Sequence, residues 1–407
     1  MQNKIIRIAN GQGFWGDSIL GPVRLLREGP IDYLTLDYLA EVTMSIMQKL
    51  KSRNAQAGYA TDFIKLLQRI LPEAQEKGVR IIASAGGVNA QACLEAAGDV
   101  VQSLGLSGVK IATITGDDIL HRLDELQASG EKFLNMDTGA AWTDVHDKVT
   151  SANVYLGAAG IVEALNQGAD IVICGRVTDP ALVLGPMIHE FGWSFNDYNK
   201  LAAGTVAGHI VECGAQCTGA NYTNWRKIKD FAMIGYPVIE MQSDGEFVIT
   251  KHPNTGGEVS TESVISQLMY EMGDPQNYIT PDVVVDFTTV HLAGAGTDRV
   301  QISGVQGKEA TPFLKVSASY SNGYKAVGQL TIAGPDALEK AKICAEIIWK
   351  RLEYDGLNFA PENKLVEFLG AAVCHAGIAP EPEQSDEIVL RIGVKDTEKS
   401  RVDRFGM

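Results

Sequence analysis

The sequence predicts an α/β fold, with a doubly wound, mostly parallel sheet in the N-terminal half followed by an α+β domain with an antiparallel sheet. In the first 225 residues, short β-branched runs alternate with amphipathic helical patterns, which is typical of βαβ units. Several of these runs stop at glycine or polar turns, as parallel strands do at their carboxyl ends. From about residue 226 onward, strand patterns follow one another directly. We therefore expect two domains, residues 1–225 and 226–407.

The elements of the first half follow from local patterns. Ile171-Val-Ile-Cys174 is a continuous apolar run, as expected for a strand that is covered on both faces. Asp179 and Pro180 then occupy favoured positions for a helix start, which predicts a helix over residues 181–189. The other predicted strands are residues 4–9, 33–36, 79–84 and 109–114, and the other predicted helices are residues 38–50, 62–75, 90–103, 152–167 and one that begins at Tyr198.

The second half has the pattern of an antiparallel sheet. Strands are predicted over residues 246–250, 283–287, 299–305, 313–320, 324–332 and 389–395, with a long amphipathic helix over residues 335–354. Asn322-Gly323 separates two of these strands and is a strong hairpin signal. Residues 254–257 and 379–385 are predicted surface loops.

Composition narrows the function classes. The formal net charge of -15 disfavours nucleic acid and anionic membrane surfaces as partners. No apolar run approaches the roughly 18 residues of a membrane span, and the N-terminus lacks a signal-peptide pattern. The six cysteines are scattered and form no disulfide framework. We therefore expect a cytoplasmic protein, with a homo-oligomer as the default assembly.

Four predicted strands of the first half end in glycine or polar turns, at residues 10–13, 85–89, 115–118 and 175–176. Because these turns share one edge of a parallel sheet, their backbone N–H groups converge there and could receive a small anionic substrate. Glycine is also needed in such turns for backbone reasons alone, so no single turn identifies a site. The predicted substrate-binding residues in and beside these turns are Gly11, Gly13, Gly86, Gly87, Asn89 and Thr178.

Residues 11–16 form a Gly-x-Gly-x-x-Gly pattern after a strand, with Asp37 about 20 residues further on, as in dinucleotide-binding folds. Asp17 would repel a pyrophosphate at the helix start, and Phe14 and Trp15 are bulky where a cofactor must approach. We therefore keep an NAD(P)-linked oxidoreductase only as an alternative, and interpret Asp17 as an N-cap or a site carboxylate.

Arg176 directly follows a predicted buried strand, so its guanidinium requires an anionic partner. That partner is Asp179, Asp17 or a substrate carboxylate. We predict Arg176 as the substrate-binding cation, with a structural ion pair as the alternative. Asp179 is a site carboxylate in the first case and a helix N-cap in the second.

His209, Glu212 and Cys213 fall at positions i, i+3 and i+4 of the helix that begins at Tyr198, which places them on one face. A carboxylate beside an imidazole is a common way to build a general base. His209 and Glu212 are therefore the predicted proton-transfer pair, with Asp17 or Asp179 as the second acid/base group. A histidine that only packs or caps is the alternative, and the cysteine spacing is too weak a signal to predict a metal site.

Two further carboxylates, Asp37 and Glu41, lie one turn apart at a predicted helix start, where they complement the helix dipole. The sequence contains neither a Gly-x-Ser-x-Gly elbow nor a phosphate loop ending in Gly-Lys-Ser/Thr. Serine hydrolases and P-loop nucleotidases are thus disfavoured.

Several ordered segments of the chain form a recognisable set. They are Asp37-Tyr-Leu-Ala-Glu41, Ala85-Gly-Gly-Val-Asn89, Ala152-Asn-Val-Tyr-Leu-Gly157, Gly168-Ala-Asp-Ile-Val172, Gly175-Arg-Val-Thr-Asp179, Phe191-Gly-Trp193 and Gly208-His-Ile-Val-Glu-Cys-Gly214. Taken together, these segments resemble the acyclic terpene utilisation (AtuA) family, and the resemblance runs from about Ile5 to at least Asn224.

The resemblance implies catabolism of branched acids and acyl-CoA thioesters, but it supplies no catalytic residues. The leading hypothesis is a lyase of the hydratase or dehydratase type that acts on a branched hydroxy acid or its CoA thioester. A non-catalytic subunit of an acyl-CoA-processing complex is a further alternative. No resident cofactor is implied, and the need for a divalent metal is left open. The resemblance also implies that longer members of the family continue into a small ferredoxin-like domain. For this chain, a separate small subunit could supply that domain.

Overall fold

The computed structural model describes residues 4–375, 378 and 385–406. The chain forms two compact units, Met1–Tyr320 and Ser321–Met407. The change from alternating helices and strands to consecutive strands, near residue 225, falls inside the first unit. The two-domain division at that residue stays a prediction. The predicted loop at residues 379–385 lies almost wholly outside the described residues.

The first unit is built on a nine-stranded sheet in the order β11-β12-β8-β7-β1-β2-β3-β6-β4. The strands are β1 (Ile5–Gln12), β2 (Tyr33–Leu36), β3 (Arg80–Ala83), β4 (Ile111–Ile114), β6 (Ile171–Cys174), β7 (Pro237–Gln242), β8 (Phe247–Lys251), β11 (His291–Gly294) and β12 (Arg299–Ser303). From β1 to β4 along this order the strands are parallel, and β7, β8, β12 and β11 extend the sheet by antiparallel pairing.

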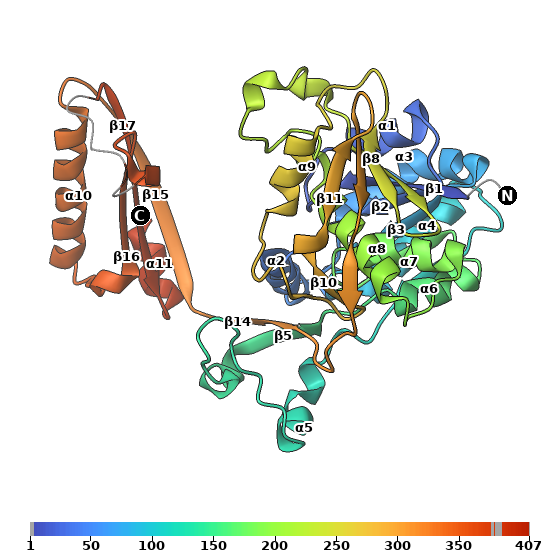
Figure 1. Ribbon diagram of the computed structural model, residues 1–407. Helices are drawn as coiled ribbons and strands as arrows, with labels where there is room; N and C mark the ends of the chain where they lie inside the picture. The colour runs from blue at the N-terminus through green and yellow to red at the C-terminus, as the bar shows by residue number, and fades with distance from the viewer. Residues whose placement is uncertain (1–3, 376–377, 379–384, 407) are drawn as a thin grey trace. The chain divides into compact units, whose positions relative to one another are not determined.

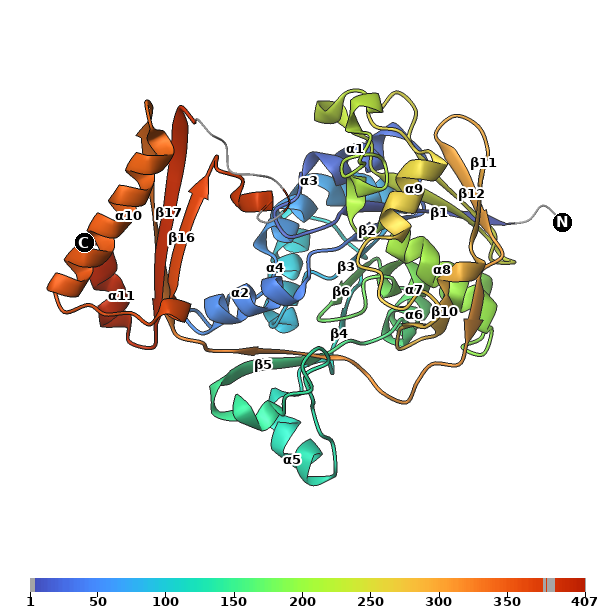
Figure 2. The same cartoon turned by 60° about the vertical axis from the view of Figure 1, so that its left-hand side comes forward.

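Helices cover both faces of the parallel part, as Figure 2 shows for α3 and α4 on one side and α7 and α8 on the other. The helices of this unit are α1 (Leu20–Glu28), α2 (Glu41–Lys51), α3 (Thr61–Lys77), α4 (Ala90–Ser103), α5 (Leu123–Ala128), α6 (Ala159–Asn166), α7 (Ala181–Phe191), α8 (Tyr198–Val211) and α9 (Thr261–Leu268). The chain moves in one direction from β1 to β4 and then reverses to β6 and β7. Right-handed crossovers therefore place α1, α3 and α4 on one face and α6 to α8 on the other.

Each face has its own core. In β6, Ile171 and Ile173 pack with the α3 side, while Val172 and Cys174 pack with the α7 side. This alternation follows from the two-residue period of a strand and requires apolar residues at every position. The doubly wound α/β class predicted from the sequence is confirmed.

Two predicted elements are wrong, one within the first unit and one at the start of the second. The helix predicted over residues 152–167 is divided into a strand, β5 (Val149–Val154), and the shorter helix α6. The hairpin predicted at Asn322-Gly323 does not form, because the strand before it, β14 (Val316–Tyr320), pairs with β5 instead. This turn lies at the start of the second unit (Figure 1). The small strands β9 (Tyr278–Ile279), β10 (Val284–Asp286) and β13 (Gln306–Lys308) form a separate antiparallel sheet.

The second unit is a three-stranded antiparallel sheet in the order β15-β17-β16, packed with two helices. Its elements are β15 (Tyr324–Ala333), α10 (Ala337–Tyr354), β16 (Lys364–Leu369), β17 (Glu387–Asp396) and α11 (Lys399–Phe405). Alternate residues of β17, including Ile388, Leu390 and Ile392, are buried together with Ala337, Ala341 and Ala345 of α10.

One buried carboxylate of the first unit makes the stability of the protein dependent on pH. Burial raises the pKa of Asp282 to about 6, although its carboxylate accepts hydrogen bonds from the backbone N–H of Ala158. Because this pKa lies above that of an unfolded aspartate, the unfolded chain releases the proton first as pH rises. Between about pH 4 and pH 6, the free energy of unfolding is therefore expected to fall by roughly 2–3 kcal/mol.

This fall can be measured by urea unfolding at pH 4.5 and at pH 7.5. Asp282→Asn should reduce the difference between the two pH values, since an amide does not titrate. An unchanged difference in the variant would contradict the role of Asp282.

Candidate functional site

The carboxyl ends of the parallel strands are tied together by hydrogen bonds. After β2, the N–H of Asp37 donates to the carbonyl of Gln12 at the end of β1 (3.0 Å), and Asp37 Oδ1 accepts from the hydroxyl of Ser84 after β3 (2.8 Å). After β6, Arg176 Nη1 donates to the carbonyl of Leu39 (3.2 Å). The predicted gathering of turns from distant parts of the sequence at one sheet edge is therefore present.

The end of α8 is fixed to the same edge by Asn10, a buried residue of β1. Its Nδ2 donates to the carbonyls of Val211 (2.6 Å) and Glu212 (3.0 Å). Thr35 on β2 in turn donates its hydroxyl to Asn10 Oδ1 (3.0 Å). These contacts bring the predicted proton-transfer pair, which begins at His209, to the end of β1.

Arg176 is at the centre of this edge and is only 2% exposed. Its Nη1 lies 2.8 Å from Asp179 Oδ1, and its guanidinium carbon lies 4.1 Å from the centre of the Tyr155 ring. Its backbone N–H donates to Asp117 Oδ2 (2.9 Å). The structural ion pair with Asp179 is thus present, and the exposed member of the pair is Asp179, whose side chain is 32% exposed. Substrate binding by Arg176 stays a prediction.

Tyr155 connects Arg176 to a second ion pair. The Tyr155 hydroxyl donates to the carboxylate of Glu41, which also pairs with Lys315 Nζ at 2.9 Å. Although burial opposes ionisation of Glu41, the hydrogen bonds from Tyr155 and Lys315 lower its pKa to about 2. Glu41 is therefore more than a helix-dipole residue. The Tyr155 and Lys315 contacts were not predicted, because Tyr155 lay in an expected helix and Lys315 is 139 residues away from Arg176 in sequence.

Asp37 is buried and lies near three charged groups. Burial raises its pKa, the negative charge of Asp179 raises it further, and Arg176 lowers it. Glu212 also raises the pKa of Asp37. Asp37, Asp179 and Glu212 therefore belong to one electrostatic group with Arg176.

His209 and Glu212 form a buried pair, with Nδ1 of the imidazole 3.1 Å from Oε1 of the carboxylate. The distance is that of an ion pair, although the alignment does not satisfy the geometry of a hydrogen bond. The His209 ring packs against both Tyr278 and Phe287, each at 5.4 Å between ring centres, and these two aromatic rings are 4.9 Å apart. The side chains of His209 and Glu212 are 2% and 11% exposed, so Glu212 is the more accessible residue, although its Oε2 is enclosed and has no hydrogen-bond partner among the described residues.

The pKa values of this pair reflect opposing effects. Burial lowers the pKa of His209, but the adjacent Glu212 carboxylate raises it to a net value above that of a free imidazole. Burial raises the pKa of Glu212, and the positive charge of His209 partly reverses that shift. Asp179 raises both values, which links this pair electrostatically to the Arg176 group.

Asp17, the other predicted acid/base residue, is held within its own turn. Its Oδ2 accepts from the N–H of Gly13 (3.0 Å), and its Oδ1 accepts from the hydroxyl of Tyr236 (2.8 Å). Helix α1 begins at Leu20 rather than directly after Gly16. A carboxylate of the chain thus takes a turn amide that a pyrophosphate would need, which disfavours dinucleotide binding at residues 11–16.

The predicted substrate-binding glycines are close-packed. A Cβ on Gly11 would lie 2.8 Å from Pro22, on Gly86 2.7 Å from the carbonyl oxygen of Cys174, and on Gly87 2.3 Å from the sulfur of Met47. Gly87 also has a φ of +53°, a conformation that favours glycine. These residues allow turns to pack closely, and their contact with a substrate stays a prediction.

The remaining two predicted substrate-binding residues have structural contacts. Asn89 Nδ2 donates to the carbonyls of Ala55 (2.9 Å) and Ala57 (2.8 Å) at the start of α4. Thr178 donates its backbone N–H to the carbonyl of Leu156 (2.9 Å). Both hold neighbouring segments in place beside the sheet edge.

Gly13 makes the closest approach between the β1 turn and the end of α8. A Cβ there would lie 2.5 Å from the backbone carbonyl carbon of Cys213. We expect Gly13→Ala to lower the free energy of unfolding by roughly 1–3 kcal/mol, because backbone must move to relieve the overlap. Gly98→Ala in α4 is the matched control, since its Cβ would meet no atom within 4 Å. This control should raise the free energy of unfolding by roughly 0.5–1 kcal/mol. Urea unfolding of both variants measures the two changes. Equal effects in the two variants would show that the turn is loosely packed.

Among residues 4–375, 378 and 385–406, no group of three or more His, Cys, Asp and Glu side chains could hold a metal ion. Within the same residues, no helix is long and apolar enough to cross a membrane.

Comparison with known proteins identifies the family of this chain. The model of the family described as "Acyclic terpene utilisation family protein AtuA" matches residues 6–407, so the match continues well beyond the segments that carried the resemblance. Neither the curated proteins nor the solved structures contain a match. With its turns, its Arg176 group and nearly its whole length covered by this match, the chain belongs to the acyclic terpene utilisation (AtuA) family.

Proposed function

We propose that this protein is a catabolic lyase that adds or removes water at a branched hydroxy acid or its acyl-CoA thioester. The observation that supports the proposal most strongly is the coupling of two ion pairs, His209–Glu212 and Arg176–Asp179, at the carboxyl edge of the sheet. Burial raises the pKa of Glu212, and a raised pKa makes a carboxylate a more effective general base near neutral pH.

The exposed fractions of these side chains support different roles for the two members of each pair. Glu212, backed by the enclosed His209, is the base that takes the proton from the carbon next to the substrate carbonyl. Asp179, the accessible partner of Arg176, gives a proton to the hydroxyl group that leaves from the neighbouring carbon. One C–H bond and one C–O bond break, a carbon–carbon double bond forms, and water is released. Asp17 is an alternative to Asp179 as the acid.

The experiment is a screen of purified full-length protein against enoyl-CoA thioesters, hydroxyacyl-CoA thioesters and the free acids, with and without divalent metal ions. We expect loss or gain of enoyl thioester absorbance with one branched substrate, and a raised melting temperature with its unreactive analogue. If NADH alone raised the melting temperature and all acids and thioesters failed, the oxidoreductase alternative would replace this proposal.

A further inference from the structure

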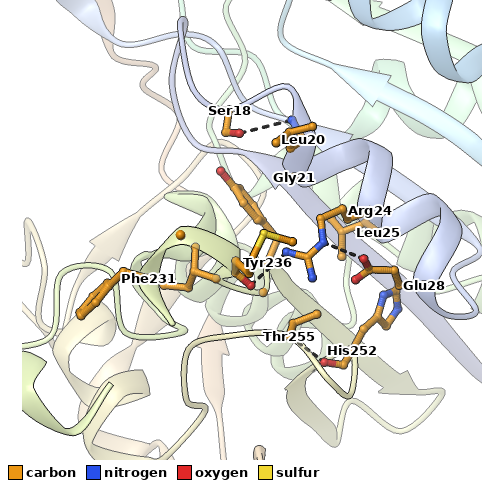
Figure 3. A pocket seen from close by; sticks show the side chains of 14 residues that line it. Ser18, Leu20, Gly21, Arg24, Leu25, Glu28, Phe231, Tyr236, His252 and Thr255 are labelled. Atoms are coloured by element: carbon orange, nitrogen blue, oxygen red, sulfur yellow. Dashed lines mark hydrogen bonds and ion pairs between the residues drawn. The ribbon is translucent and has the colours of Figure 1, made fainter. Parts of the chain in front are cut away.

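A cavity of about 140 Å³ lies beside α1, between this helix and the segments that flank β7 and β8. It shares no lining residue with the Arg176 group or with the His209–Glu212 pair. Figure 3 shows that its polar side chains include Arg24 and Glu28 of α1 together with Tyr236, His252 and Thr255. The cavity therefore needs an explanation separate from the proposed reaction.

Arg24 provides the cationic end of this cavity. Its Nε lies 2.7 Å from Glu28 Oε1, and its Nη1 donates to the carbonyl of Met233 at 3.0 Å (Figure 3). Its Nη2 has no hydrogen-bond partner among the residues that the structure describes. The Arg24 side chain is 19% exposed, so the guanidinium is held in place by two bonds and still offers one nitrogen.

The rest of the lining is largely apolar. Leu25 is buried at its base, and Phe231 and Met233, each 45% exposed, stand at its opening. Burial lowers the pKa of His252, which also lines the cavity, so this histidine adds no positive charge at neutral pH. Arg24 and Glu28 are therefore the charged groups of the lining at neutral pH.

We propose that this cavity binds a small aliphatic carboxylate, with its carboxylate on Nη2 of Arg24 and its alkyl part against Leu25 and Met233. A guanidinium binds carboxylates and phosphates through charge-assisted hydrogen bonds, and an apolar wall next to it favours an acid with an alkyl group. With about 30 Å³ per water molecule in the liquid, the cavity equals roughly five waters, which suits an acid of the size of isovalerate. The proposal holds whatever reaction the protein catalyses.

Glu28 predicts the direction in which the affinity for a carboxylate should change when its charge is removed. Its carboxylate already occupies Nε of Arg24 and partly neutralises the guanidinium. A bound carboxylate is repelled by Glu28 while it is attracted by Arg24. Removing the two charges one at a time should therefore change the affinity in opposite directions.

The test is a titration of full-length protein, labelled with ¹³C in the methionine methyl groups, with isovalerate and with its neutral amide, isovaleramide. The resonance of Met233, assigned with Met233→Leu, reports on the cavity opening. We expect saturable shifts with the acid, affinity at least tenfold weaker in Arg24→Gln, and affinity about threefold tighter in Glu28→Gln. Arg27→Gln, on the same helix but paired with Glu73, is the control and should bind as the unaltered protein does.

Three results would overturn the proposal: equal binding of acid and amide, unchanged affinity in Arg24→Gln, or weaker affinity in Glu28→Gln. If Arg24→Gln fails to fold, the affinity of Glu28→Gln for isovalerate and the binding of isovaleramide still test the proposal. A failure of the proposed lyase reaction leaves this titration unaffected, because its readout is a chemical shift at Met233.

Discussion

Replacement of Arg176 by methionine is expected to lower the free energy of unfolding by about 3–5 kcal/mol, the usual cost of breaking a buried ion pair. The loss arises because Asp179 loses its ion-pair partner and the buried Asp37 loses the positive charge that lowers its pKa. The carbonyl of Leu39 also loses its donor. Urea unfolding at neutral pH measures the change.

Two variants make this result specific. Arg176→Lys keeps the charge, but a lysine cannot stack on the Tyr155 ring while it also reaches Asp179 Oδ1 and the carbonyl oxygen of Leu39. We therefore expect this variant to recover only part of the stability. Arg27→Met removes an exposed arginine that pairs with Glu73 and should change stability little. If Arg176→Met were no more harmful than Arg27→Met, the Arg176 group would not organise the sheet edge.

Replacement of Glu212 by glutamine is expected to lower kcat of the proposed reaction by about 10²–10⁴-fold, the usual contribution of a general base. Independently of any substrate, it should also lower the pKa of His209, since burial then acts without the compensating carboxylate. NMR titration of the His209 ring nitrogens measures this shift.

Glu271→Gln is the matched control for this prediction. Glu271 is exposed, and its negative charge raises the pKa of Glu212 only through a minor electrostatic effect. We expect its kcat and the titration of His209 to change little. A Glu212→Gln protein that retained full activity and an unchanged His209 pKa would exclude the proton-transfer role of the pair.

The local sequence was sufficient for much of the fold. β2 and α4 lie where the apolar period predicts them, because each element is decided by neighbouring residues and by burial against the sheet. The error at residues 152–167 has a different cause. Val149–Val154 becomes a strand only because β14, more than 150 residues later, pairs with it. Strand pairing between segments so far apart produces no periodic pattern in the local sequence. Because β14 pairs with β5, it is also not available for the hairpin expected at Asn322-Gly323.

For the site, the sequence by itself determined the α/β class, the residue types at the sheet edge and the 209/212 pair, since helical spacing alone places two residues on one face. Only the tertiary structure decided which partners these residues take. It enclosed Arg176 between Asp179, Leu39 and Tyr155. It also packed the predicted anion-binding glycines closely against neighbouring residues. Burial and charge pairing depend on elements far apart in the chain, and these are the quantities that set a pKa or close a guanidinium to solvent.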